Sequence, residues 1–516
     1  MNFLTLLRKR LLEPKGILFT LLLLLTLLRV PNFAEPYWYG DEGIYLTIGN
    51  ALREGGKLYT TIVDHKTPLI YYLAMVQNQL QFRILMYGMM MLSTAAFFAV
   101  CRTLFGRLKP AAIATLLFVI FTSLPWFEGH IPNGELFVIC FVLYGAWILL
   151  HTSLVKTYFS SDEVRRQRMP SPKEQALLLL AGVSFGLALL TKVPALFDIV
   201  AFGLIFVFLA WRTRLKHLAP QLLSAGIFAI GCLLPLVISV VYFYAVGSGQ
   251  DYLNFGLLYN FKYAGSWQLS FTSPVVLFFF TLQGKALVLG GMLLLLLGLN
   301  RKLSPVTQFS LAWFWLALFA SLLSNRPYPH YFLQVIPPAA ILVALFFTRE
   351  RGLALISGSL TVLLAVLVLL HVGLYSTGAY YKNWLKYLTK QYTRQEYFQT
   401  FDSLMNDNYA AAKLITTTSS KPSLFIWGTD PMLYALTKAV PPTRFTVSFH
   451  IADLNVYEQT MKDVNAARPE YIVVMNDETR ELPGLNQLLF DEYTINTQYD
   501  KFALWKRLPN AAGLLY

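Results

Sequence analysis

The chain has 516 residues, of which 56% are hydrophobic and only 14% are charged. A soluble protein would carry about 25% charged residues, so the composition excludes an ordinary soluble globular protein. The formal net charge of +14 comes from short basic clusters between apolar segments, which is typical of a multi-pass membrane protein and argues against a nucleic-acid partner. The three cysteines all lie within apolar segments, so neither a disulfide framework nor a zinc motif is indicated.

Long apolar segments recur from the N-terminus to about residue 375. A helix that crosses a bilayer needs about 20 mainly apolar residues, and on this basis we expect about eleven spans. The first segment is long and many others follow it, so we interpret it as a retained helix and not as a cleaved signal peptide. The predicted spans are Gly16–Val30, Phe82–Phe105, Ala111–Phe127, Leu136–Leu154, Gln175–Leu190, Leu196–Trp211, Gln221–Val246, Pro274–Leu299, Val306–Leu323, Tyr331–Phe347 and Leu353–Leu374.

The first connection, residues 31–81, carries ionisable residues at a density unmatched in the apolar segments around it. Apolar residues recur at helical spacing after Asp41-Glu42 and stop at Gly55-Gly56, and His65-Lys66 follows. This pattern predicts a short amphipathic helix lying on the membrane surface. Two structural alternatives are open: Asp41 as a helix N-cap, and Lys66 as a residue that reaches for lipid headgroups. The segment Leu69–Ala74 is too short to span and is expected to continue the surface loop.

The distribution of basic residues predicts the orientation in the membrane. With a cytoplasmic N-terminus, every inside connection is basic, whereas the outside connections are poorer in Lys and Arg and richer in aromatic residues, Gly and Pro. An odd number of spans then places everything after Leu374 on the outer side. The basic residues of the inside connections are Arg8, Lys9, Arg10, Lys15, Arg102, Arg107, Lys109, Lys156, Arg165, Arg166, Arg168, Lys173, Arg212, Arg214, Lys216, Arg301, Lys302, Arg349 and Arg351.

The last part of the chain is polar and alternates helix-like with strand-like segments. Ser423–Trp427 and Tyr471–Met475 are predicted buried strands, preceded by helix-like Gln395–Ile415 and Val456–Ala467 respectively. We therefore expect an all-α polytopic membrane domain over residues 1–375, which includes the first outer loop, and a soluble α/β domain over residues 376–516 on the extracytoplasmic side. The second domain carries no recognisable catalytic signature, and we expect it to be structural or to bind an acceptor.

Three ionisable residues lie near the predicted outer ends of spans: Glu135, Lys192 and Lys285. A lysine at the centre of a bilayer costs about 2.5–3.5 kcal/mol, so such residues either reach an interface or face a polar cavity. For Lys285 we expect the side chain to reach the outer surface. For Lys192 and Glu135, which lie in Pro-containing turns, both alternatives are open.

These residues share a predicted side of the membrane with Asp41 and Lys66. Carboxylates can abstract protons and cations can stabilise an anion, so an outer cavity of this kind suits a lipid phosphate. Lys66, Lys192, Arg326 and His330 could stabilise a phosphate leaving group, and Asp41 could act as a base. The residue types alone indicate a phosphate-binding cavity and go no further.

Three motifs follow one another along the chain: Asp41-Glu42 after the first span, Asp64-His65-Lys66-Thr67-Pro68, and Pro329-His330-Tyr331-Phe332-Leu333-Gln334 with Pro337-Pro338. In this order the motifs resemble those of bacterial GT-C glycosyltransferases, in the superfamily of protein O-mannosyltransferases and lipid A aminoarabinose transferases. It covers residues 1–375 and extends weakly into the tail through Ile426-Trp427-Gly428 and Pro441-Pro442-Thr443-Arg444.

The resemblance implies an inverting transfer of a hexose- or pentose-type sugar from a polyprenyl-phosphate donor to an acceptor on the outer face of the membrane. Asp41 matches the general base of the family, with Glu42 beside it, and Glu135 occupies the place of a second acidic residue in a divergent context. Lys66 matches a lysine that contacts the lipid phosphate, although the motif reads Lys-Thr-Pro here. The full set expected at the donor phosphate is His65, Lys66, Lys192, Arg326, His330 and Tyr331.

The main alternative is a transporter or flippase for a lipid-linked saccharide, and a third is a non-catalytic assembly protein. A transporter would be expected to show inverted repeats and broken helices near the midplane, and no such repeat is evident. The expected partners are the lipid-linked donor, a glycan, lipid or protein acceptor, and membrane lipid. No cofactor or metal ligand is assigned from the sequence, and a divalent metal is left open.

Overall fold

The computed structural model of the chain describes residues 10, 12–159, 168–264, 267, 269–348, 350–419 and 421–509. It divides into two compact units that do not follow sequence order. Unit 1 comprises Met1–Val30, Leu85–Tyr242 and Leu258–Thr377, and unit 2 comprises Pro31–Ile84, Phe243–Leu257 and Gly378–Tyr516. Among the basic residues of the predicted inside connections, Arg8, Lys9, Arg165, Arg166 and Arg349 lie outside the described residues.

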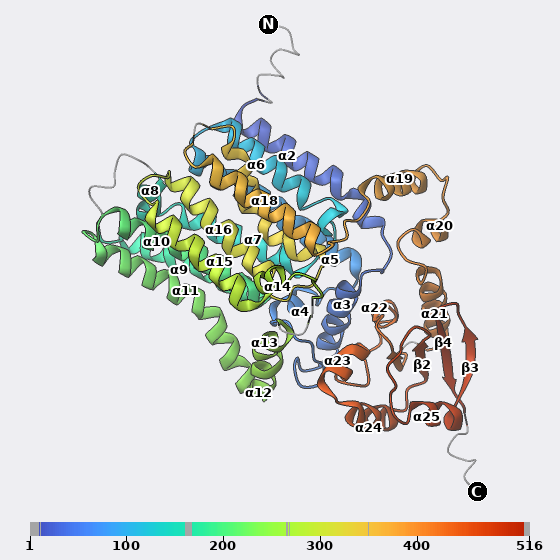
Figure 1. The fold of residues 1–516 in the computed structure, drawn as a ribbon. Helices are drawn as coiled ribbons and strands as arrows, with labels where there is room; N and C mark the ends of the chain where they lie inside the picture. The colour runs from blue at the N-terminus through green and yellow to red at the C-terminus, as the bar shows by residue number, and fades with distance from the viewer. Residues whose placement is uncertain are drawn as a thin grey trace. The chain divides into compact units, whose positions relative to one another are not determined.

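Unit 1 is a bundle of mainly apolar helices (Figure 1). Several helices begin at a Ser-Pro pair, because the serine caps the first free amides and proline fits the first helical position. Ser171 accepts from the amide of Glu174, and Ser304 from that of Thr307. The helices are α2 (Pro14–Arg29), α5 (Gln79–Phe105), α6 (Leu108–Phe121), α7 (Gly134–Leu149), α8 (Ser153–Phe159), α9 (Pro172–Thr191), α10 (Leu196–Arg212), α11 (Leu218–Ala245), α13 (Tyr259–Ala264), α14 (Pro274–Phe280), α15 (Leu282–Gly298), α16 (Pro305–Ser321), α17 (Ile336–Leu345) and α18 (Leu353–Leu369), with short helical turns η2 (Pro125–Phe127), η3 (Val193–Ala195) and η5 (Pro329–Val335).

The core of unit 1 lies around α16, which contacts α10, α15, α17 and α18. Almost every residue of α16 is buried. Its Phe309 and Trp313 pack edge-on against Phe202 of α10, with ring centroids 5.0 Å apart in each pair. A helix that is apolar all round in this way belongs in the interior of a bundle.

Helices α9 and α11 approach each other through glycines. A Cβ atom added to Gly182 would lie 2.3 Å from the carbonyl oxygen of Phe228, and one added to Gly231 would lie 2.4 Å from that of Leu179. Small residues of this kind let two membrane helices pack backbone to backbone.

The helices support a multi-pass membrane protein. Within the described residues, five helices are long and apolar enough to cross a membrane, and seven if each of two bent pairs is one span. The bent pairs are α7 with α8, at 93°, and α14 with α15, at 73°. Every predicted span coincides with a helix or a bent pair, while the number of about eleven spans stays a prediction.

Lysine 285 does not reach the surface as expected. Its side chain is 7% exposed, and the ammonium donates to the carbonyl of Leu322 at 2.5 Å and to Oδ1 of Asn325 at 2.9 Å. The end of α16 leaves carbonyl groups without helical partners, and a cation there is stabilised by the helix dipole. Lys285 therefore caps a helix.

Unit 2 combines the first connection with the segment Phe243–Leu257 and the C-terminal residues. Its C-terminal residues form a four-stranded sheet with helices packed beside it (Figure 1). The elements are α3 (Gly40–Arg53), α4 (Leu69–Leu73), α12 (Gly249–Asp251), η4 (Tyr252–Leu258), α19 (Thr377–Leu388), α20 (Arg394–Gln399), α21 (Met405–Thr418), β1 (Leu424–Trp427), α22 (Met432–Thr437), α23 (Ser448–Leu454), α24 (Tyr457–Ala467), β2 (Tyr471–Met475), α25 (Leu485–Glu492), β3 (Tyr493–Gln498) and β4 (Phe502–Arg507).

The strand order is β1-β2-β4-β3, with β1 parallel to β2 and the other pairs antiparallel. Helices α21 and α22 cover one face of the sheet, and α24 and α25 cover the other. Strands buried on both faces appear as continuous apolar runs, so both predicted strands are confirmed. The predicted helix Gln395–Ile415 is instead two helices, α20 and α21.

The predicted helix after Asp41-Glu42 is present as α3, but its predicted position on a membrane surface is wrong. Every residue from 42 to 51 is buried, because α4 and α22 pack on it. Two glycines allow this contact: a Cβ atom on Gly49 would lie 2.2 Å from the carbonyl oxygen of Ala74, and one on Gly43 would lie 2.7 Å from Met432. Tyr39, and not Asp41, is the N-cap.

Candidate active site

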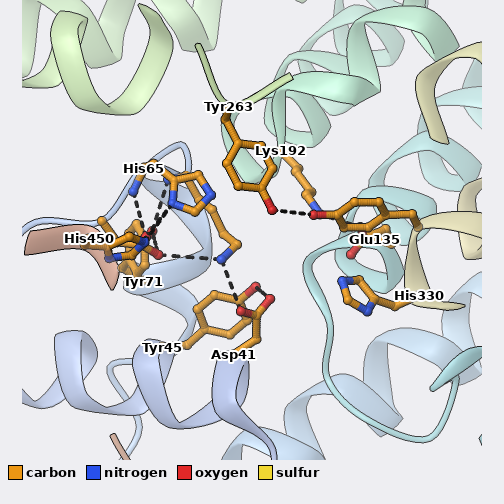
Figure 2. A network of polar contacts seen from close by, with 12 residues as sticks. Asp41, Tyr45, His65, Tyr71, Glu135, Lys192, Tyr263, His330 and His450 are labelled. Atoms are coloured by element: carbon orange, nitrogen blue, oxygen red, sulfur yellow. Dashed lines mark hydrogen bonds and ion pairs between the residues drawn. The ribbon is translucent and has the colours of Figure 1, made fainter. Parts of the chain in front are cut away.

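Each unit holds one cluster of the residues singled out in the sequence, and Figure 2 shows both. We call them the Asp41–Lys66 cluster, in unit 2, and the Glu135–Lys192 cluster, in unit 1. Each is described by itself.

Asp41 lies in the first turn of α3, where the helix dipole favours a carboxylate. Its Oδ1 lies 3.4 Å from the ammonium of Lys66, and its Oδ2 accepts a hydrogen bond from the Tyr45 hydroxyl at 3.0 Å. The Asp41 side chain is 28% exposed and that of Lys66 is 8% exposed. The cluster therefore presents a carboxylate, partly open to its surroundings, beside a mostly buried cation.

A second carboxylate, Asp64, lies behind this pair. Its side chain is fully buried, and its Oδ2 accepts from the Tyr71 hydroxyl at 2.6 Å and lies 3.6 Å from the Lys66 ammonium. Burial opposes ionisation of Asp64, but Lys66 and His65 outweigh that effect and hold the pKa of this carboxyl well below its usual range. Asp64 therefore stays charged and holds the Lys66 side chain in place.

The loop that carries Lys66 is held by the C-terminal residues of unit 2. The amide of Val63 donates to the carbonyl of Arg444 at 2.7 Å, and the Arg444 guanidinium donates to the carbonyl of Tyr59 at 2.7 Å. The Tyr59 hydroxyl in turn donates to the Lys66 carbonyl at 2.7 Å. The backbone of this loop is thus held at Tyr59, Val63 and Lys66.

Glu42, the neighbour of Asp41, makes a different set of contacts. Arg83 of α5 binds it with two parallel hydrogen bonds, at 2.8 and 2.7 Å, and Gln79 donates to it at 2.8 Å. The same guanidinium lies 3.4 Å from Glu35, to which the Tyr380 hydroxyl also donates. This buried network anchors the first turn of α3, and so fixes the position of Asp41.

The Glu135–Lys192 cluster is formed by helix ends. Glu135 lies in the first turn of α7, and Lys192 is the C-cap of α9, where Pro194 prevents the helix from continuing. The two side chains form an ion pair. The Lys192 ammonium also lies 4.4 Å from the centre of the Tyr331 ring.

Aromatic residues connect this ion pair to a second cation. The hydroxyls of Tyr331 and Tyr263 are 2.9 Å apart, and the Arg326 guanidinium lies 4.4 Å from the centre of the Tyr263 ring. Next to Tyr331 in the chain, His330 pairs with Glu128, whose backbone adopts the left-handed conformation with φ of 55°. Unit 1 therefore brings together two cations, Lys192 and Arg326. It also holds two acidic residues, of which Glu135 pairs with Lys192 and Glu128 pairs with His330.

No family model and no curated protein sequence matches the chain. The structure, however, is similar to the crystal structure of ArnT from Cupriavidus metallidurans bound to undecaprenyl phosphate, with a TM-score of 0.56 and 14% identity over 95% of this chain and 98% of that one. The chain has the GT-C fold. The apo structure of an Archaeoglobus fulgidus oligosaccharyltransferase is also similar, with a TM-score of 0.46 and 13% identity over 90% of this chain and 69% of that one. The structure of AglB from Archaeoglobus fulgidus in complex with an inhibitory peptide and a dolichol-phosphate has a TM-score of 0.43 and 13% identity over 96% of this chain and 74% of that one.

In this GT-C chain eight of the nine predicted site residues lie in one of the two clusters, whereas Glu42 belongs to the separate network of Arg83. Sequence reasoning named Asp64 only as part of a motif, and it missed five further members: Tyr45, Tyr71, His450, Glu128 and Tyr263. His450 contacts His65 at 3.2 Å from 385 residues further along the chain, and no local signal marks it. Glu128 could have been found, because an acidic residue in an aromatic connection between apolar segments is unusual.

Proposed function

We propose that this chain is an integral membrane glycosyltransferase that moves a sugar from a polyprenyl-phosphate-linked donor to an acceptor on the outer face of the membrane. The observation that supports the proposal best is the partly exposed Asp41 carboxylate paired with Lys66 at the start of α3. The fold supports it as well, because the similar ArnT structure is bound to undecaprenyl phosphate. That lipid suggests the class of carrier for this chain.

In the proposed reaction, Asp41 accepts the proton of the acceptor hydroxyl or amine. The acceptor oxygen or nitrogen forms a new bond to the anomeric carbon of the sugar from the face opposite the phosphate. The bond between that carbon and the phosphate oxygen breaks, its electron pair leaves with the oxygen, and polyprenyl phosphate is released. The configuration at the anomeric carbon is therefore inverted, and a general base of this kind typically contributes about 10²–10⁴-fold in rate.

The leaving phosphate needs stabilisation of its developing negative charge. We assign this role to Lys66, Lys192 and Arg326, each a cation that packs against an aromatic ring. Tyr331 then orients Lys192 through its ring, and His330 is held beside it by its pair with Glu128. His65 lies 2.9 Å from Asp64, so we assign it to holding the loop beside Lys66.

The two remaining acids are assigned as positioning residues. Both carboxylate oxygens of Glu42 are engaged by Arg83, so Glu42 acts on the reaction by fixing α3. Glu135 pairs with Lys192 and keeps its ammonium in one orientation. Asp41 is then the carboxylate assigned to proton transfer.

The test is donor cleavage by the purified full-length protein in lipid nanodiscs. A panel of polyprenyl-phosphate hexoses and pentoses is incubated with cell-envelope extract as the acceptor source, and mass spectrometry follows released polyprenyl phosphate and new glycosylated products. We expect cleavage of one donor class, with Asp41→Asn as the inactive control. If the protein instead moves the intact lipid-linked saccharide from one leaflet of a proteoliposome membrane to the other without cleaving it, the transporter alternative is established.

The melting temperature provides a second measurement, which is informative even if none of the donors in the panel is cleaved. Undecaprenyl phosphate, added alone, should raise the melting temperature of the wild-type protein more than that of Lys66→Ala or Lys192→Ala. No cleavage of any donor together with no stabilisation by the lipid phosphate would overturn the proposal.

A further inference from the structure

A buried carboxylate of α10 connects three segments of unit 1. Asp198 lies in the first turn of this helix, and its side chain is 2% exposed. Its Oδ1 accepts from the Trp313 indole of α16 at 2.7 Å, and its Oδ2 accepts from the Gln334 amide of η5 at 2.5 Å. Burial of an acid in a candidate span is costly, so its presence there indicates a role that an apolar residue could not fill.

Gln334 also binds a group close to Lys192. A glutamine amide has two N–H donors, and the same nitrogen of Gln334 donates to the carbonyl of Pro194 at 3.1 Å. Pro194 lies in η3, the turn directly after Lys192. The amide of Ala195 in this turn donates back to the Lys192 carbonyl at 3.1 Å. The Gln334 side chain therefore bridges the start of α10 and the turn that follows Lys192.

The segment that carries Gln334 also carries Tyr331. The two residues are three positions apart in η5, and side chains with this spacing lie on one face of a 3-10 helix. The Tyr331 ring in turn lies 4.4 Å from the Lys192 ammonium. The two hydrogen bonds of Gln334 therefore hold this ring beside Lys192.

A carboxylate suits the position of Asp198 better than an amide does. It offers acceptor oxygens to both of its donors at once, whereas asparagine has one acceptor oxygen. Trp313 can only donate, so that oxygen would stay with the indole and the asparagine amide would face the Gln334 amide. If the Gln334 amide turned over to accept, Pro194 would lose its donor. Asp198→Asn therefore breaks one of these links and keeps the size of the side chain.

We propose that Asp198 and Gln334 are positioning residues for Lys192, which they hold in the orientation that binds the lipid phosphate. They act through Tyr331 and through the turn after Lys192, and neither is assigned a contact with the donor. The inference rests on the proposed function, because it takes Lys192 as a residue that binds the donor phosphate. The alternative is that the same hydrogen bonds only stabilise the helix bundle.

The experiment measures the affinity of the full-length protein for added undecaprenyl phosphate, by native mass spectrometry in detergent. Asp198→Asn and Gln334→Met should bind it about 3–10-fold more weakly than the wild type does, because Lys192 is less well oriented. Trp313→Phe is the matched control, since it removes the hydrogen bond to the other oxygen of Asp198 and leaves Gln334 in place. This variant should lower the melting temperature and leave the affinity unchanged.

A double-mutant cycle separates an effect through Lys192 from a general effect on the fold. In the background of Lys192→Met with Glu135→Gln, Gln334→Met should cause no further loss of affinity, since the lysine that it positions is absent. An equal loss in both backgrounds, or wild-type affinity in Gln334→Met alone, would overturn the proposal. If Asp198→Asn does not fold, Gln334→Met decides the matter, because it leaves the carboxylate bonded to Trp313. Absence of binding by the wild type would overturn the phosphate assignment in the proposed function and this inference with it, so the two failures are distinguishable.

Discussion

The contacts of Asp41 differ from those of its neighbour Glu42 in a way that suits the base proposed above. Its neighbour Glu42 is held by Arg83, whereas Asp41 keeps a partly exposed carboxylate beside Lys66. Since Tyr39 is the N-cap of α3, loss of the Asp41 charge does not remove a helix cap.

We therefore expect Asp41→Asn to fold and to bind the donor, with turnover lower by about 10²–10⁴-fold. Turnover and donor binding are measured separately on the purified variant. Arg102→Ala, at an exposed position of α5, serves as a control for the effect of an unrelated substitution. Near-normal turnover by Asp41→Asn would refute the assignment of the base.

Lys192 can be tested without leaving a buried charge unpaired. In Lys192→Met combined with Glu135→Gln, both members of the ion pair become neutral. If Lys192 binds the lipid phosphate, this double variant should bind the donor about 10–100-fold more weakly, as expected for loss of a charge-assisted hydrogen bond worth about 1.5–3 kcal/mol. Lys262→Ala, an exposed lysine of unit 1, should bind normally. Wild-type affinity in the double variant would mean that the pair is only structural.

At the scale of elements, α3 depends on a single guanidinium. Arg83 neutralises Glu42 and Glu35, and all three side chains are almost completely buried. Arg83→Ala should therefore destabilise unit 2 by about 3–5 kcal/mol, because it leaves two buried carboxylates without their cation. Thermal unfolding in detergent measures the loss, and Arg102→Ala on the same helix should change the stability by less than about 0.5 kcal/mol. Equal melting temperatures for the two variants would show that the network does not anchor α3.

The contact between α9 and α11 leads to another prediction at this scale. Gly182→Ala places a methyl group against a backbone oxygen that cannot move easily, so we expect a loss of about 1–3 kcal/mol. Gly226→Ala on α11 meets no atom within 4 Å and should be neutral or slightly stabilising, since alanine is the better helix former. Equal melting temperatures for the two variants would contradict the close approach of the helices.

For the whole molecule, the predicted orientation is testable with cysteines. The native Cys101, Cys140 and Cys232 are buried, so they should give little background. In spheroplasts, a membrane-impermeant maleimide should label Glu481→Cys, which is exposed in the C-terminal residues, and should spare Lys173→Cys until the membrane is permeabilised. The reverse labelling pattern would invert the topology and place the proposed chemistry on the cytoplasmic side.

Much of the architecture was predictable because it depends on local composition. A long apolar segment is a membrane helix wherever it occurs, and a short, fully apolar run in a polar region is a buried strand. For this reason the helices of unit 1 and both strands β1 and β2 were predicted, whereas the number of membrane spans stays a prediction. Strand β3 was not predicted, since only Tyr493 of its residues is buried. The short apolar run at the start of β4 was overlooked.

The sequence by itself determined the membrane character of the chain, its main helices and the residue types at the candidate site, including Asp41, Lys66, Glu135 and Lys192. Only the tertiary structure decided the partners of these residues: Glu42 with Arg83, Glu135 with Lys192, and Asp64 with His450. It also decided that α3 is buried, because glycines and long-range packing set the approach of α22 to α3. Hydropathy and spacing are properties of a short window, whereas a contact between side chains hundreds of residues apart exists only once the chain has packed.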